Sequence, residues 1–207
     1  MHVQRDTSRV IRSRISVNQW LQRTPTVDEA RPAACVVCGV AARPPGGLLA
    51  LHGHGLRDRQ VRGPRSPSEK PYQVGIEARR YDCQRCPAVL IVVPSEVVPH
   101  RHYAASAIAF AVALYGACAR SQRDVRDAVS ADRIVGERAA RRWCTLARWI
   151  DAVAARTLFP ALPLLPPGLP RRAVAERAAM SIGAHAPPPL PAGAPEVRAF
   201  FGAAQLP

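Results

Sequence analysis

Four of the six cysteines in this 207-residue chain stand in two C-x2-C pairs: Cys35, Cys38, Cys83 and Cys86. Each C-x2-C step bends the backbone so that both sulfurs face one point, and four thiolates in a tetrahedron are a ligand set that zinc favours. Gly39 follows the first pair and supplies the permissive backbone that such a turn needs. Pro87 follows the second pair and has no N–H to donate to a thiolate. The spacing predicts one structural zinc ion, with iron in the same cage or a redox dithiol as the alternatives.

The cellular compartment decides whether these thiols stay reduced. Residues 1–15 carry charges every few positions and contain no apolar stretch typical of a secretory signal. The longest apolar run, 104–119, is rich in alanine and shorter than the roughly 20 residues that cross a bilayer. We therefore expect a cytoplasmic protein with no membrane segment, whose cysteines bind metal and do not form disulfides.

The residues between and after the cysteine pairs have the character of β-strands. Three segments are predicted as strands: 47–63, 72–83 and 88–94. They predict an antiparallel zinc ribbon over residues 35–100, too small to be stable without its metal. His52 and His54 lie inside it. Because four thiolates are already available, we expect these imidazoles to be surface groups or phosphate contacts and not ligands.

From Tyr103 onward the apolar residues recur at the helical period. Three helices are predicted, at 104–118, 121–129 and 136–156, the second opening at Ser121, a good N-cap. Three helices with a short break indicate a helix-turn-helix module over residues 103–157.

The third predicted helix has two distinct faces at 100° per residue. One is a core stripe: Ala139, Trp143, Leu146, Ala147 and Ile150. The opposite face carries the residues predicted to enter a DNA major groove: Arg138, Arg141, Thr145 and Arg148. Arg142 lies at the flank and suits a phosphate. The alternative is a solvated basic face on an ordinary surface helix. Cys118 and Cys144, also in the helical part, are predicted as small core residues.

Two further segments complete the prediction. Residues 1–34 are expected to be helical or irregular, with a short helix around Trp20. Residues 158–207 contain two proline-rich stretches around one short helical segment, and we expect a partly disordered tail with little core. The predicted fold class is therefore α+β: a small zinc ribbon, a helical module and a Pro-rich tail.

The charge balance points to a polyanionic partner. The chain has 29 lysine and arginine residues against 15 aspartate and glutamate residues, a net charge of +14. A genomic bias for arginine over lysine does not explain the scarcity of acidic residues, so nucleic acid is the expected partner. A basic surface without a partner is the alternative.

Taken together, these segments resemble a bacterial family of transposase-like zinc-ribbon proteins. Five segments over residues 15–157 carry the resemblance: RPAACVVCG, LHGHGLRDRQVRG, ARRYDCQRC, VVPHRHY and RRWCTLARW. The family implies an N-terminal zinc ribbon and a helix-turn-helix that bind the double-stranded DNA of a mobile element. In longer relatives a catalytic domain follows, but here the acids after residue 157 are only Glu176 and Glu196.

The resemblance therefore implies DNA binding and no enzymatic activity. It suggests a mobile-element accessory protein, a truncated transposase or a regulator derived from one, with a separate catalytic transposase subunit as a further partner. The alternatives from other classes are a zinc-ribbon adaptor that binds RNA or protein, and an enzyme acting through a site that no motif reveals.

Overall fold

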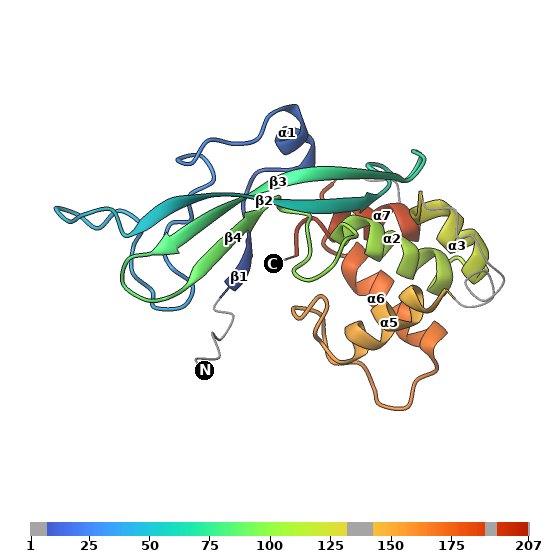
Figure 1. Ribbon diagram of the computed structural model, residues 1–207. Helices are drawn as coiled ribbons and strands as arrows, with labels where there is room; N and C mark the ends of the chain where they lie inside the picture. Colours follow the sequence, from blue (N-terminus) through green and yellow to red (C-terminus); the bar gives the residue numbers. More distant parts are fainter. Residues whose placement is uncertain (1–7, 132–142, 189–193, 207) are drawn as a thin grey trace, which may run out of the picture. The chain divides into compact units, whose positions relative to one another are not determined.

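The computed structural model describes residues 8–131, 143–188 and 194–206, and these form a mixed α+β structure (Figure 1). The chain divides into two compact units. The first contains residues 8–61 and 75–102, and the second contains residues 62–74 and 103–206. Each unit is described below by itself.

A four-stranded sheet with the order β1-β4-β3-β2 is the framework of the first unit (Figure 1). Its strands are β1 (Ser8–Arg12), β2 (Leu51–Gly63), β3 (Tyr72–Cys83) and β4 (Val89–Val93). β4 lies antiparallel to β3, with Leu90 opposite Tyr81, and parallel to β1, with Ile91 opposite Val10. The three predicted strands are therefore present, but the sheet is mixed and not purely antiparallel.

The parallel strand β1 lies within the segment that we expected to be helical or irregular. The short run SRVIR gives a weak strand signal, and its partner is about eighty positions away in the chain. The predicted helix around Trp20 is α1 (Val17–Gln22), which opens with a capping box between Ser16 and Gln19. Trp20 is buried, and its Nε1 donates to the carbonyl of Glu77 at 3.0 Å.

Residues 24–31 continue from α1 across one face of β3. The hydroxyl of Tyr81 donates to the carbonyl of Val27 at 2.6 Å, and Nε of Arg79 donates to the carbonyl of Pro25 at 2.6 Å. Arg79 and Tyr81 are two positions apart and so share one face of the strand. These bonds connect the N-terminal segment to the strand that ends at Cys83.

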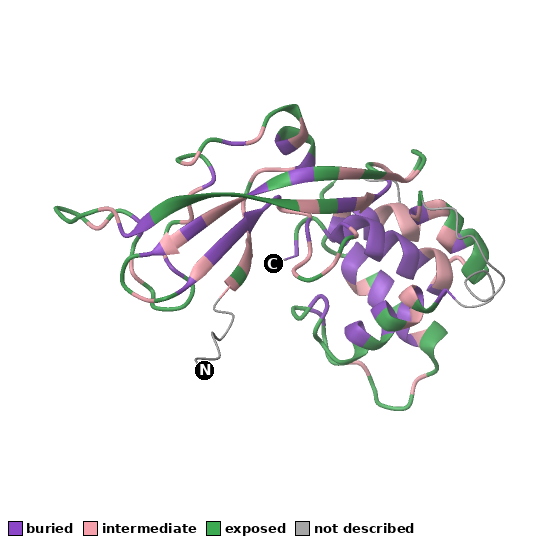
Figure 2. Cartoon of the chain, in the orientation of Figure 1, coloured by how far each residue is buried: buried purple, intermediate pink, exposed green. Residues whose placement is uncertain are grey.

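The second unit is helical and is built around α2. Its helices are α2 (Ala105–Gly116), α3 (Gln122–Val129), α5 (Cys144–Ala154), α6 (Arg171–Gly183) and α7 (Pro195–Gly202). α2 contacts the other four, and residues 105–113 are all buried (Figure 2). This agrees with the prediction of a buried helix over the apolar run. Among the described helices, none has the length and apolar character needed to cross a bilayer.

The residues after 157 contribute more to the core than a Pro-rich tail would. α6 and α7 pack against α2 and against each other. The ring of Phe200 meets that of Phe110 edge to face, with centroids 6.0 Å apart. Pro195 stands in the first turn of α7, where its missing N–H has no helical acceptor to lose. In this part of the chain the prolines flank and start helices.

Candidate metal centre

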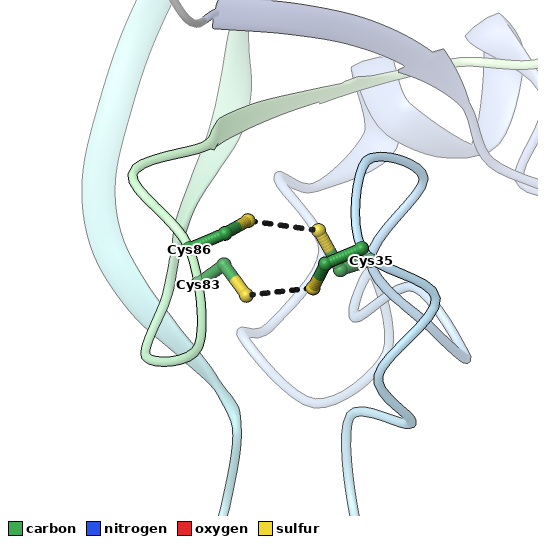
Figure 3. A group of neighbouring side chains, drawn as sticks. Cys35, Cys83 and Cys86 are labelled. Carbon is green, nitrogen blue, oxygen red and sulfur yellow. Dashed lines mark hydrogen bonds between the residues drawn. The ribbon is translucent and has the colours of Figure 1, made fainter.

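The two cysteine pairs come together at one end of the sheet in the first unit (Figure 3). Sγ of Cys35 lies 3.8 Å from Sγ of Cys86, Sγ of Cys38 lies 3.7 Å from Sγ of Cys83, and all four sulfurs lie within 4.8 Å of one another. Sulfurs placed about 2.3 Å from a central ion at tetrahedral corners are about 3.8 Å apart. The cysteines are free thiols. The cage therefore has the size and donor set of a closed four-coordinate metal site.

The two turns that present the thiols are built alike. The amide of Cys35 donates to the carbonyl of Val40 at 2.9 Å, and the amide of Cys83 donates to the carbonyl of Ala88 at 3.1 Å. Each bond joins the first cysteine of a pair to the residue five positions later. Both turns are thereby closed by the same bond, and the two sulfurs of each pair face the opposite turn.

The turns differ at the position after the second cysteine. In the first turn the amide of Gly39 donates to the carbonyl of Cys35 at 2.8 Å, and Gly39 has φ +74°. Pro87 occupies the same place in the second turn and has no amide to donate. There the amide of Arg85 approaches Sγ of Cys83 at 3.4 Å, so the second turn keeps an amide directed at a sulfur.

Replacing Gly39 with alanine tests the left-handed backbone of the first turn. Nothing lies within 4 Å of a Cβ at this position, so the expected loss of stability comes only from the strain of alanine at a positive φ. We expect the free energy of unfolding to fall by about 1 kcal/mol while the metal is retained. Urea titration of the metal-loaded protein measures it. Gly75→Ala, in open space and without positive φ, is the control and should be neutral or slightly stabilising; equal effects at the two glycines would contradict the turn geometry.

The thiols of the cage do not ionise alike. Burial opposes ionisation of Cys35, but amide groups at Cys38 and Val37 outweigh it and lower its pKa to about 7. At Cys86 a backbone bond with Ala88 favours the thiolate, yet burial and the neighbouring thiols raise its pKa to about 12. A metal ion must therefore displace a tightly held proton, and its affinity should fall as the pH is lowered.

The predicted DNA-contacting helix is described only in part. Residues 136–142 of this helix lie outside the described part of the chain; they include Ala139 of the predicted core stripe and three predicted DNA contacts, Arg138, Arg141 and Arg142. In α5, Arg148 is exposed and Thr145 is half-buried. The inward face is buried and contains Trp143, Leu146, Trp149 and Ile150. The edge-to-face contact of Trp149 with Tyr103, at 4.9 Å between centroids, ties this face to the start of the helical unit.

The two histidines lie outside the thiol cluster. Nε2 of His52 is 2.8 Å from the carbonyl of Leu49, and Nδ1 of His54 is 2.7 Å from a carboxylate oxygen of Asp82. Both imidazoles are exposed. The contact of His54 with Asp82 was not foreseen from the sequence, because it depends on which residues of β2 and β3 lie together.

The two cysteines outside the cage differ from the core residues that we predicted. Cys144 is exposed at the start of α5, and Cys118 is half-buried with its Sγ 3.1 Å from a carboxylate oxygen of Glu196. Burial and this carboxylate raise the pKa of Cys118 to about 11. The Cys118 thiol therefore stays protonated near neutral pH.

Comparisons of the chain with protein-family models, with curated proteins and with solved structures give no match. A functional conclusion must therefore come from the chemistry of the chain itself. The four-thiol cage is its main basis, and the excess of positive charge supports it.

Proposed function

We propose that the protein binds double-stranded DNA and that a structural zinc ion holds its first unit together. The single observation that carries this proposal is the four-thiol cage. Soft thiolate ligands in a tetrahedral set suit zinc, and four protein ligands leave no open position for a substrate. The ion would therefore support the fold and take no part in chemistry.

The excess of positive charge supports a nucleic-acid partner. Several arginines of the described structure pair with a carboxylate, as in Arg23–Glu29, Arg43–Asp28 and Arg171–Asp151. With 29 basic residues against 15 acidic ones, at least 14 cations must be balanced by something outside the chain. The phosphates of duplex DNA can balance these charges, and binding is favoured because it releases counterions from the DNA.

The finer proposal is that the helical unit acts as a helix-turn-helix. Arg138 and Arg141 would meet base edges, with Thr145 and Arg148 further along the same face and Arg142 at a phosphate. The resemblance to transposase-like proteins supports a role as a mobile-element accessory or a derived regulator in the cytoplasm. Any strand transfer would then be performed by a separate catalytic transposase subunit.

A second candidate function is that of an adaptor that binds protein or RNA, and one observation favours it. A groove of about 740 Å³ lies beside the metal cage, with Val40, Leu49 and Arg85 in its lining. Leu48, also in the lining, is 92% exposed, and Val36, in the first cysteine turn, is 58% exposed. Exposed apolar residues of this kind are typical of docking surfaces.

Binding of the zinc-loaded protein to a random-sequence duplex tests the proposed function. We expect binding that weakens steeply with salt, the logarithm of the association constant falling by about 0.9 per phosphate contact for each unit of log salt. Fluorescence anisotropy at several salt concentrations measures this slope, and a duplex selected for binding measures sequence preference. No binding to any duplex at low salt would refute the proposal, and tighter binding to single-stranded RNA would favour the adaptor.

A further inference from the structure

Most residues of strand β2 are exposed to solvent. β4 pairs with β3 over Arg79–Asp82, so the β3 residues before Arg79 have only β2 beside them in the described sheet. β2 lies at the edge of the sheet, and its residues 52–58 and 60 are exposed (Figure 2). A strand of this length exposes its side chains for contact with a partner.

Two arginines stand together on this exposed strand. Arg57 and Arg59 are two positions apart, so their side chains leave the same face of β2, about 6.6 Å apart along the strand. Asp58 lies between them and points to the opposite face. Within the described ranges, no carboxylate forms an ion pair with either guanidinium.

The electrostatics of this pair are those of an anion site. Arg59 is half-buried, and its pKa is lowered first by burial and then by the positive charge of Arg57. A partly buried guanidinium that faces a like charge and has no carboxylate partner is unfavourable. An anion placed between the two groups would relieve the repulsion and satisfy their N–H donors.

We propose that Arg57 and Arg59 form a phosphate-binding site through which the β2–β3 pair contacts the backbone of duplex DNA. This inference rests on the proposed function and adds a second contact surface, separate from the predicted recognition helix. Guanidinium groups bind phosphate oxygens with two parallel hydrogen bonds. A two-stranded β-ribbon also fits the width of the major groove, whose walls are formed by the two phosphate backbones.

The double substitution Arg57→Gln with Arg59→Gln tests the site. The matched control is Arg23→Gln with Arg171→Gln, which removes the same two charges and takes the net charge from +14 to +12. Arg23 and Arg171 are exposed and already paired with carboxylates. Binding of each protein to the same random-sequence duplex is measured at several salt concentrations. We expect the salt slope to become shallower by about 1.8 for the double variant, and to change little for the control.

The outcomes separate this site from the proposed function. If wild type binds no duplex, the proposed function is wrong. If wild type binds and the double variant keeps the full slope, DNA binding stands and the Arg57–Arg59 site is wrong. Equal losses in both variants would indicate a general effect of net charge and also overturn the site. A lysine version, Arg57→Lys with Arg59→Lys, keeps both charges and should retain the wild-type salt slope. If its slope becomes as shallow as that of the glutamine version, the two charges are not the cause of the change and the proposed site is wrong.

Discussion

Cys83→Ser is expected to release the metal and unfold the first unit. Cys83 closes β3 and supplies one of four ligands, and a cage with three thiolates binds the ion far more weakly. Metal binding in small zinc domains contributes on the order of 10 kcal/mol to folding, more than a small sheet gains from its own core. The measurements are zinc content by elemental analysis and protection of the first-unit amides from hydrogen exchange.

The matched control for this change is Cys144→Ser, because Cys144 is exposed and outside the cage. The Cys144→Ser protein should keep its zinc and the protection of its first-unit amides from hydrogen exchange. A Cys83→Ser protein that still holds one zinc per chain would show that the cage is not the metal site. We expect the helical circular dichroism to survive in Cys83→Ser, since the second unit has its own core around α2. Loss of that signal would mean that the two units unfold together.

The second large effect is expected at Gly116, where α2 passes close to α6. A Cβ at this position would collide with the backbone of Glu176 and Ala175. Backbone atoms within a helix cannot move aside as a flexible side chain can, so Gly116→Ala should cost about 3 kcal/mol and lower the melting temperature of the helical unit by about 10 °C.

Gly183→Ala is the control for Gly116→Ala. It makes the same substitution in a helix of the same unit, but its nearest contact is the Cβ of Arg198 at 3.2 Å. The gain in helix propensity should offset this mild crowding and leave the melting temperature nearly unchanged. Thermal unfolding followed by circular dichroism compares the two. An unchanged melting temperature for Gly116→Ala would contradict the close approach of α2 and α6.

The parts of the fold that the sequence predicted correctly have local signals. Each C-x2-C step places two thiols within four residues, and the two steps together supply the four ligands of one metal ion, so they predicted the cage. The β3 segment is alternating in character, and the β4 segment is apolar over its five residues. Ser121 could be recognised as an N-cap because the capping bond is local: its hydroxyl accepts from the amide of Asp124, only three positions later.

The parts that were missed depend on distant partners. β1 is a five-residue segment whose strand character comes from pairing with β4, far along the chain. The short helical segment predicted between the two proline-rich stretches is α6, but its packing into the core was not foreseen, and α7 lies among prolines that outweighed its apolar content. Phe200 of α7 packs against Phe110, which stands about ninety positions earlier in the chain. The contact of His54 with Asp82 and the crowding at Gly116 likewise follow from packing between elements, which composition and periodicity do not reveal.

The parallel pairing of β1 with β4 has a consequence for the order of events during synthesis. Ser8–Arg12 is made before its partner Val89–Val93, which follows about eighty residues later. The amide of Val17 donates to the carboxylate of Glu96 at 2.9 Å, and this bond also cannot form until Glu96 has been made. The first cysteine turn is likewise complete long before Cys83 and Cys86 exist. The sheet and the four-thiol cage of this unit therefore cannot be complete before residues 83–93 have been made, because both depend on long-range contacts.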